Sequence, residues 1–497
     1  MKKMISAKLF PVLILASLLL SCGSETADTP KETSAAPDAA ADTVMEEPVD
    51  EALRDALPAL DYGGEKVTMS VQDYGAYTGV DVFSEAENGE IVNDAVYARN
   101  RSVEERLNID LEFVPITHAW DDRSNYLTMI RSTVQAGDGA FDILHGLGYF
   151  MPGFVSDGIL SDMSGLPYID LSKKWWNSCF MDASSVDGKY YFVTGDASLT
   201  LIKNMYCIYF NQDFMTRFDI QAEELYQEVY DGKWTMEALG AVVRDCYADL
   251  NGDGKTDRED QFGLLLNSGN HYTGFIEALD VDIVERSGND YRYVFDSEHN
   301  TEAMQVLSDL VKNNPGVYYD TKGESETAYN SLFRNGNIMM ATGWLLHTDS
   351  FRSVDFKYGV LPYPKLDEGQ ESYKTTVLTS YTVFSVPADC KDPERAAAVL
   401  EAFGSESYRT VTPAYFETAL KVKYASSADT GKMFDLIRDN ISFDFGYIYT
   451  IAMDGISDQF KNNVGSSKGW ASVAEGLRSK TEKKLTALLE AIRAVES

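Results

Sequence analysis

The sequence lacks the short motifs by which many enzymes and metal centres are identified. It contains no His-Glu-x-x-His pair, and its five histidines show no metal-ligand spacing. Gly254-Lys255-Thr256 lacks the upstream glycine of a phosphate-binding loop. The stretch from Gly465 to Gly469 fits Gly-x-Ser-x-Gly, but no strand precedes it to strain the serine into place. We therefore predict a chain that is not an enzyme. A surface glycan hydrolase or lyase that uses acidic residues is the alternative.

Positive charge and long apolar runs are also scarce. Lys and Arg number 43 against 78 Asp and Glu, which gives a net charge of −35. Such a field repels nucleic acids and anionic lipid head groups, so neither is an expected partner. Beyond the N-terminal region, no apolar run approaches the roughly 20 residues that a membrane-spanning helix needs.

Cysteines are few and widely spaced. The five cysteines form no Cys-x-x-Cys unit, so the sequence supports neither a zinc site nor thioredoxin-like chemistry. If Cys22 is modified by lipid, four remain, an even number that permits two disulfides outside the cell. Four buried thiols are equally compatible with the sequence. These cysteines are Cys179, Cys207, Cys246 and Cys390.

The N-terminal region has the pattern of an export signal. Basic Lys2, Lys3 and Lys8 precede an apolar stretch from Leu9 to Leu20, and Ser21-Cys22-Gly23 follows. The stretch is short for a membrane span. We predict a lipoprotein signal peptide over residues 1–21 and lipidation of Cys22, which would anchor the chain at the extracellular face of the membrane. A plain signal peptide or an uncleaved anchor is the alternative.

Residues 22–61 are predicted to be a disordered acidic linker. They are rich in Ala, Thr, Asp, Glu and Pro, and almost devoid of aromatic residues, so they cannot bury enough apolar surface to offset the entropy of ordering. Folded structure is expected from about residue 62. With 497 residues in the chain, two or more lobes are expected, because one core stops growing near 250–300 residues.

Strand and helix patterns alternate along the folded part, which predicts α/β lobes with mostly parallel sheets. Strands are expected over 66–71, 111–115, 141–145, 190–193, 205–210 and 261–266. Helices are expected over 89–111, 120–137, 234–250, 301–312, 393–403, 433–440 and 470–495.

The segment from Asp249 to Asp260 carries the clearest chemical motif. Its oxygen-bearing residues and Gly254 have the spacing of an EF-hand loop, which wraps hard oxygen ligands around calcium. The last position is Asp rather than the usual Glu, and the following residues resemble a strand. We predict a lone structural Ca²⁺ site; an acidic surface turn without metal is the alternative. The predicted ligands are Asp249, Asn251, Asp253, Lys255 through its carbonyl, Asp257 and Asp260.

Several stretches, in order along most of the chain, resemble the extracellular solute-binding protein family 1, the sugar-type substrate-binding lipoproteins of ABC transporters. The resemblance is to the Clostridia-like members. The stretches are Ile91–Asn100, Glu104–Ile109, Gly139–Leu144, Gly188–Gly195, Ile208–Asn211, Phe333–Trp344 with its Gly-Trp pair, and Leu361–Lys365.

The resemblance implies a two-lobed, periplasmic-binding-protein-like fold of type II character, with a ligand cleft between lobes joined by a hinge. Lobe one is expected over 62–205 plus 328–380, and lobe two over 206–327 plus 381–497. By family position, the side chains expected to face the cleft are Tyr74, Tyr149, Trp175, Asp196, Tyr272, Trp344 and Tyr381. Aromatic faces suit sugar rings, but core packing is the alternative for each.

The function implied by this resemblance is a receptor that closes around a small solute, a carbohydrate such as an oligosaccharide, and delivers it to ABC permease subunits. A sensory or adhesive binding protein without transport is a further alternative. Peptide, polyamine and metal ligands are compatible with the sequence.

Overall fold

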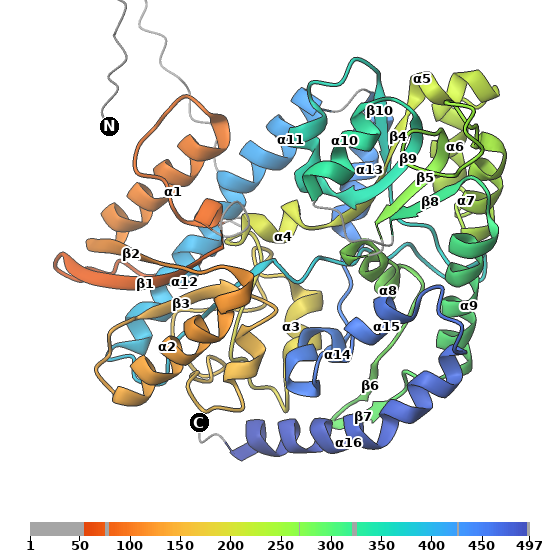
Figure 1. Ribbon diagram of the computed structural model, residues 1–497. Helices are drawn as coiled ribbons and strands as arrows, with labels where there is room; N and C mark the ends of the chain where they lie inside the picture. Colours follow the sequence, from red (N-terminus) through yellow and green to blue (C-terminus); the bar gives the residue numbers. More distant parts are fainter. Residues whose placement is uncertain (1–53, 75–78, 268, 321–325, 425–426, 495–497) are drawn as a thin grey trace, which may run out of the picture. The chain divides into compact units, whose positions relative to one another are not determined.

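The computed structural model describes residues 54–74, 79–267, 269–320, 326–424 and 427–494 (Figure 1). The predicted signal peptide and the lipidation site Cys22 lie outside the described residues. In the described part no helix is both long and apolar enough to cross a membrane.

The first of two main sheets has the strand order β11-β3-β1-β2. β1 pairs in parallel with β2 and β3, and β11 runs antiparallel to β3. α1 and α12 pack against each other beside this sheet, where Arg99 donates a 3.0 Å hydrogen bond to Ser407. The elements of this first lobe are β1 (Glu65–Asp73), α1 (Ile91–Leu107), β2 (Ile109–Thr117), α2 (Arg123–Ala136), β3 (Ile143–Leu147), α3 (Ser178–Ser184), α4 (Leu199–Lys203), β11 (Thr382–Ser385) and α12 (Pro393–Arg409).

Local sequence explains the boundaries of α1. The Glu90 carboxylate accepts hydrogen bonds from the first-turn N–H groups of Val92 and Asn93, which fixes the start of the helix. Asn108 ends it in the left-handed conformation, at φ 49°. The chain therefore turns at once into β2, which lies in register beside β1 from Ile109 to Thr117.

The second sheet has the order β10-β4-β9-β5-β8. β5 is parallel to β8 and β9, whereas β4 is antiparallel to β9 and β10. Its strands are β4 (Tyr206–Asn211), β5 (Phe262–Asn267), β8 (Val317–Asp320), β9 (Ile338–Trp344) and β10 (Tyr358–Leu361). The helices up to β10 are α5 (Gln212–Met215), α6 (Ala222–Tyr230), α7 (Met236–Val243), α8 (Phe275–Ala278), α9 (Glu298–Asn313), α10 (Glu326–Arg334) and α11 (Thr348–Phe351).

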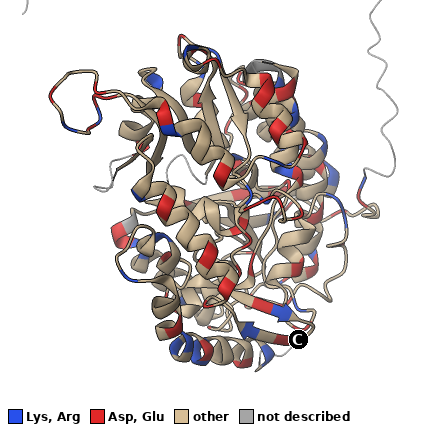
Figure 2. Ribbon diagram, turned by 90° about the vertical axis from the view of Figure 1, so that its right-hand side faces the viewer, with Lys and Arg blue, Asp and Glu red and all other residues tan. Residues whose placement is uncertain are grey.

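The C-terminal segments add helices and lie against a small hairpin. The hairpin is β6 (Val284–Ser287) and β7 (Asp290–Tyr293), and α16 (Trp470–Ala494) packs against β7 and α9. Charged residues of both signs lie along the elements, with the acidic ones spread over much of the ribbon (Figure 2). The remaining segments are a π-helix (Pro413–Tyr424), α13 (Ala428–Asp439), α14 (Phe445–Ile448) and α15 (Asp458–Asn463).

The strand pairing corrects the expected division of the chain. β9 and β10, within 328–380, belong to the second sheet because the fully buried strand Ile338–Trp344 fills the place between β4 and β5. β11 and α12, expected in lobe two, belong to the first lobe. The linker also ends earlier than expected: Asp55 forms an ion pair with Arg106, and Leu57 and Leu60 pack against the core.

Most predicted elements are confirmed, with shifted ends. The helix expected over 234–250 ends as an α-helix at Val243, and the one expected from residue 120 begins at Arg123. The strand expected over 190–193 is wrong: Val193 forms only an isolated bridge with Phe384.

Two of the segments that cross between the lobes pair with each other. Met205 and Val377 form an antiparallel bridge, and the N–H of Leu378 donates to the carbonyl of Asn204 at 2.9 Å. A third crossing passes through the π-helix, which connects α12 to α13. The lobes are therefore joined by a short hydrogen-bonded ribbon and by a helical segment.

Candidate ligand-binding site

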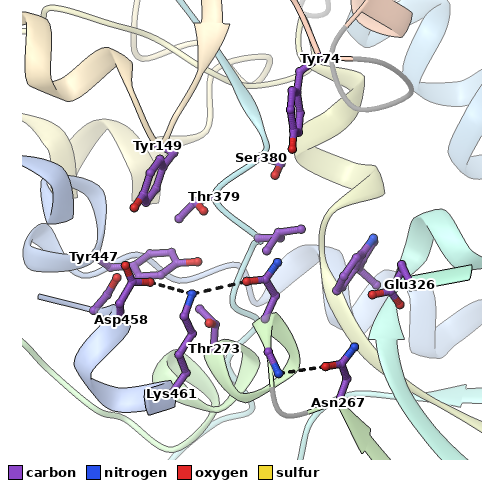
Figure 3. A pocket seen from close by; sticks show the side chains of 15 residues that line it. Tyr74, Tyr149, Asn267, Thr273, Glu326, Thr379, Ser380, Tyr447, Asp458 and Lys461 are labelled. Carbon is purple, nitrogen blue, oxygen red and sulfur yellow. Dashed lines mark hydrogen bonds and ion pairs between the residues drawn. The ribbon is translucent and has the colours of Figure 1, made fainter. Parts of the chain in front are cut away.

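A pocket of about 520 Å³ lies between the two sheets, a volume within the usual range for small-molecule sites. Tyr74, Tyr149, Asn267 and Trp344 stand at or just beyond the carboxyl ends of their strands, where ligands bind in open α/β sheets. The lining is Tyr74, Tyr149, Asn267, Gly269, Asn270, Thr273, Glu326, Trp344, Leu378, Thr379, Ser380, Tyr447, Ser457, Asp458 and Lys461 (Figure 3).

The first lobe contributes two tyrosines to the pocket. The ring of Tyr74 stacks on His118, with ring centroids 5.5 Å apart, and Tyr149 packs edge-on against Phe150 at 5.1 Å. Burial, with the nearby Asp458 carboxylate, raises the pKa of Tyr149 to about 12. The Tyr149 hydroxyl therefore remains protonated at neutral pH and can donate a hydrogen bond.

Trp344 ends β9 and lines the pocket on the second lobe with the small part of its side chain that is accessible, since it is 2% exposed. Its ring lies 4.9 Å from His271 and 4.6 Å from His347, between ring centroids. The preceding Gly343 makes this packing possible, because a Cβ there would stand 2.5 Å from Nδ1 of His347. The Gly-Trp pair of the sequence thus brings a histidine up to the tryptophan.

Glu326, at the start of α10, lies beside Trp344 and is held by both histidines. Its Oε1 is 3.2 Å from Nε2 of His271 and 3.1 Å from Nε2 of His347. Although burial acts in the opposite direction, the two histidines hold the pKa of Glu326 well below its usual range. The carboxylate is therefore ionised at neutral pH. Its side chain keeps 24% exposure at the pocket wall.

Lys461 extends from α15 toward the base of the pocket. Its Nζ lies 2.7 Å from Asp458 and 3.5 Å from the side-chain oxygen of Asn270 (Figure 3). The remaining wall comes from the crossing segment Leu378–Ser380 and from Tyr447, whose hydroxyl donates to the carbonyl of Val377 at 2.8 Å. Hydroxyl, amide and charged groups thus surround one aromatic wall.

The structure brings together Tyr74, Tyr149 and Trp344 among the residues expected to face the cleft. Trp175, Asp196, Tyr272 and Tyr381 are not in the lining. All four are buried.

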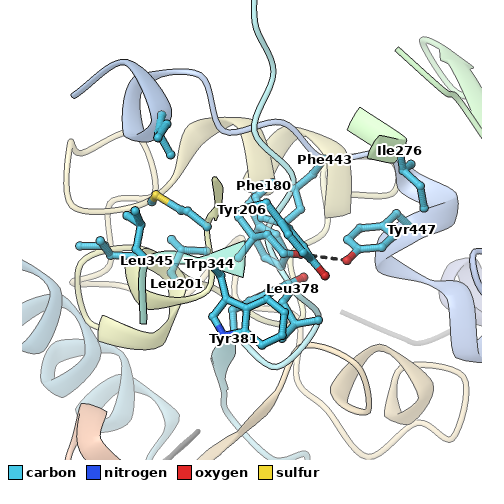
Figure 4. Packing of buried hydrophobic residues seen from close by; sticks show 14 of the residues in the cluster. Phe180, Leu201, Tyr206, Ile276, Trp344, Leu345, Leu378, Tyr381, Phe443 and Tyr447 are labelled. Atoms are coloured by element: carbon cyan, nitrogen blue, oxygen red, sulfur yellow. Dashed lines mark hydrogen bonds between the residues drawn. The ribbon is translucent and has the colours of Figure 1, made fainter. Parts of the chain in front are cut away.

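Packing and internal hydrogen bonds account for their positions. Tyr381 contacts Gly148, where a Cβ would come within 2.5 Å of its ring, and packs edge-on against Phe180 and Phe443 (Figure 4). The Trp175 indole donates to Glu401 at 3.3 Å. The remaining two are fixed near the hinge and in the second lobe.

Asp196 joins distant segments rather than facing the pocket. Its Oδ1 accepts from the hydroxyl of Thr412 at 2.6 Å and from Arg438 at 3.1 Å. Burial raises its pKa to about 6. Tyr272 is 3% exposed and lies between the lining residues Asn270 and Thr273 in sequence.

The polar residues of the pocket escaped the sequence analysis. Asn267 could have been found, because it follows the strand expected over 261–266 and so stands at a carboxyl end. Glu326, Asp458 and Lys461 occur on helices, where an acidic chain offers many equivalent candidates. No local pattern separates them from surface charges.

The loop from Asp249 to Asp260 turns its side chains onto its own backbone. Asp249 accepts from the N–H groups of Gly252 and Gly254, at 2.6 and 2.9 Å, and Asp253 pairs with Lys255 at 2.8 Å. Asp260 is fully buried and accepts from Leu250 and Asp257. Among the described residues, no three His, Cys, Asp or Glu side chains are gathered so as to hold a metal ion.

The four cysteines left open by the sequence are free thiols in the structure. Cys207 and Cys246 are buried, whereas Cys179 and Cys390 are partly buried. Burial raises the pKa of Cys246 and that of Cys390 to about 11, so these thiols are protonated and unreactive at neutral pH.

A family model described as bacterial extracellular solute-binding protein matches residues 105–408, more than half of the chain. The chain belongs to this family. The family resemblance seen in the sequence is thereby confirmed. Its members are extracellular binding proteins rather than enzymes.

Solved structures share the fold of this solute-binding protein. The GacH receptor of Streptomyces glaucescens, solved unliganded and with acarbose, has a TM-score of 0.54 at 15% identity, covering 85% of this chain and 99% of that chain. The galacto-N-biose/lacto-N-biose I-binding protein of an ABC transporter from Bifidobacterium longum, solved with lacto-N-biose, has a TM-score of 0.54 at 14% identity, with 86% and 98% covered.

An ABC substrate-binding protein from Listeria monocytogenes, in complex with cycloalternan, also has a TM-score of 0.54, at 15% identity, with 85% of this chain and 99% of that chain covered. No curated protein matches the chain. At these identities the likeness establishes the fold, and the expected two-lobed α/β architecture is confirmed.

Proposed function

We propose that this solute-binding protein is the carbohydrate receptor of an ABC importer. One observation carries the proposal: hydroxyl groups from both lobes and amide groups from the second lobe line a single pocket between the sheets, together with the edge of Trp344. Sugars present many hydroxyls on a ring whose C–H faces pack on aromatic surfaces. A mixed wall of this kind satisfies both. The neighbours solved with acarbose, lacto-N-biose and cycloalternan support the same class of ligand.

Hinge closure would supply the signal to the permease. Tyr74 and Tyr149 stand on one lobe and Trp344 on the other, so a bound saccharide gains contacts when the lobes approach. A ligand shifts an open–closed equilibrium by its differential affinity for the two states. The loaded, closed form is then the one presented to the transporter.

The experiment is thermal unfolding of the purified protein against mono- and oligosaccharides, followed by calorimetry on each hit. Ligand present at about 100 times its Kd stabilises the folded state by about 2.7 kcal/mol, which is a clear shift in Tm. Shifts with one saccharide class support the receptor. Shifts with peptides or polyamines, and none with saccharides, contradict the carbohydrate assignment.

Two further measurements separate this proposal from its alternatives. Release of shortened products from a bound glycan would indicate a surface enzyme. Loss of glycan uptake in a strain lacking the protein supports import. Unchanged uptake with an altered transcriptional response or altered surface adhesion would instead indicate a sensory or adhesive protein.

We also propose that lipid on Cys22 anchors the protein at the extracellular face of the membrane. The support is the sequence pattern Leu19-Leu20-Ser21-Cys22 after a basic and apolar start. Mass spectrometry of the mature N-terminal peptide should show a lipidated Cys22. Replacing Cys22 with Ala should release the protein from the membrane fraction.

We propose, finally, a structural calcium ion in the loop from Asp249 to Asp260. The support is chemical, because the loop offers only oxygen donors in EF-hand spacing, and hard oxygens suit Ca²⁺. Asp249, Asn251, Asp253, Asp257 and Asp260 would hold it, with the carbonyl of Lys255. We expect CaCl₂ to raise the Tm of the wild type and to leave the Tm of Asp249→Asn unchanged. Equal Tm values of the wild type in CaCl₂ and in EDTA would contradict the proposal.

A further inference from the structure

We propose that the pocket selects against acidic saccharides and that Glu326, held by His271 and His347, is the residue that makes this selection. The inference rests on the proposed carbohydrate function and narrows it. It predicts a receptor for uncharged or amino-bearing sugars, and it assigns the discrimination to one side chain.

The first support is the fixed position of Glu326. Two imidazole nitrogens from different segments meet the same carboxylate oxygen, at 3.2 Å from His271 and 3.1 Å from His347. Both histidines are buried, and Nδ1 of His271 is fixed at 2.9 Å from the hydroxyl of Thr342. The carboxylate cannot swing away from the pocket without losing these contacts.

The second support is that the carboxylate is only partly enclosed. Its side chain keeps 24% exposure and lines the same pocket as Trp344, so a sugar bound in this pocket would meet it (Figure 3). An ionised carboxylate accepts hydrogen bonds from sugar hydroxyls and from ammonium groups. It repels a ligand carboxylate at the same place.

The third support is the charge balance of the lining. Of the described residues that line the pocket, Glu326, Asp458 and Lys461 are charged. Lys461 lies 2.7 Å from Asp458, so this cation is already compensated, whereas among the described residues the ion-pair partners of Glu326 are the imidazoles of His271 and His347 rather than a Lys or Arg. An acidic ligand would bring a second negative charge into a region enclosed by protein, and a −35 chain surrounds it.

The test uses pairs of trisaccharides that differ by a carboxylate on every ring. Suitable pairs are β-1,4-mannotriose with trimannuronate, α-1,4-galactotriose with trigalacturonate, and cellotriose with its tri-glucuronate counterpart. Whichever ring lies at Glu326, the acidic member places a carboxylate there. Calorimetry at pH 7 should show binding of a neutral member, with its acidic partner at least about tenfold weaker.

Glu326→Gln then assigns the effect to its residue. The substitution keeps the size and removes the charge, so the ratio of acidic to neutral affinity should rise at least about fivefold. Glu302→Gln, an exposed residue on α9, makes the same change in net charge away from the pocket and should leave the ratio unaltered. His347→Asn is a second variant, which keeps the Glu326 charge and should keep the preference for the neutral member.

The outcomes distinguish the two proposals. An acidic trisaccharide that binds as tightly as its neutral partner overturns the selection while leaving the carbohydrate receptor intact. A folded Glu326→Gln protein with an unchanged ratio also overturns it. If no member of any pair binds while another solute class does, the carbohydrate function fails and the selection fails with it.

Discussion

Each lobe contains a glutamate whose partners set its charge, and the two glutamates differ in burial and in what surrounds them. In the first lobe, Glu401 accepts hydrogen bonds from the indoles of Trp175 and Trp176, at 3.3 and 3.1 Å, and is 1% exposed. In the second lobe, Glu326 lies beside Trp344 but is held by two histidines and faces the pocket.

The partners decide the charge of each glutamate. Indole N–H groups donate but carry no charge, so burial prevails and raises the pKa of Glu401 to about 7. Imidazoles can carry a proton, and they hold the pKa of Glu326 below its usual range against the effect of burial. Glu401 is therefore a buried hydrogen-bond acceptor for two indoles, whereas Glu326 is an ionised carboxylate at the pocket wall.

Removing the Glu401 carboxylate should have the largest effect on stability. Glu401→Ala leaves two buried indole N–H groups and the N–H of Asp170 without their acceptor, and creates a cavity, so we expect a loss of about 3–5 kcal/mol in the free energy of unfolding. Urea denaturation measures it, with the exposed Glu394→Ala on the same helix as control. A loss below 1 kcal/mol would show that the hydrogen bonds to Glu401 are dispensable for stability.

Opposite pH profiles should follow from the opposite pKa directions. The folded pKa of Glu401 is above the unfolded value, so its contribution is complete below about pH 4.5 and is lost as pH rises toward 7. Glu401→Gln should therefore gain on the wild type over that window, by about 1–3 kcal/mol after allowance for solvent screening.

Glu326 has a depressed folded pKa, so its contribution is present above about pH 4.5 and is lost as pH falls below that value. Glu326→Gln should be less stable than the wild type at pH 7, with the difference shrinking in acid. Chemical denaturation at a series of pH values compares the three proteins. Parallel profiles for the two Gln variants would contradict the assignment of the charges.

Phenylalanine substitutions should separate affinity from stability. Trp344→Phe alters the pocket wall and should weaken saccharide binding by about tenfold, or about 1.4 kcal/mol. Trp175→Phe should lower Tm and leave the Kd within about twofold, because this residue lies outside the lining. Calorimetry with the best saccharide decides; equal losses of affinity in both variants would remove the distinction between the two sites.

The smallest effect is expected from changing Thr342, the residue that contacts His271. Thr342→Val keeps the shape but removes the oxygen 2.9 Å from Nδ1 of His271, so we expect a loss of about 1 kcal/mol in stability. Affinity should fall about twofold because His271 then positions Glu326 less well. Thr486→Val, exposed on α16, is the control. A neutral result at Thr342 would mean that His347 alone fixes the carboxylate.

The sequence predicted the α/β class and most elements of the first lobe, because β1, α1, β2 and α2 follow one another with strong periodicity and short connections. It misplaced β9, β10 and β11. These strands are far in sequence from the strands they pair with. Which sheet each one joins therefore depends on long-range packing, which the local sequence pattern does not contain.

Of the aromatics expected to face the cleft, the structure places Tyr149, which follows a strand, in the pocket lining, and Trp175 and Tyr381 in the core. All are large aromatic residues next to a turn in the sequence. What separates them is the neighbour across space: Glu401 under Trp175, and Gly148 against Tyr381. Glu326 became visible only when the fold joined residues 271, 326 and 347.

The bridge between Met205 and Val377 marks the place about which the two sheets can rotate. Any rotation of one sheet against the other about this ribbon displaces a residue in proportion to its distance from the axis. Leu378 adjoins this ribbon, and Thr379 and Ser380 follow it, so these pocket residues lie near the hinge axis and would move little. Lining side chains farther from the axis, on either sheet, would move more. The part of a ligand bound near the hinge axis would keep the same contacts in the open and closed states. The contacts made by its far end would form only when the lobes close.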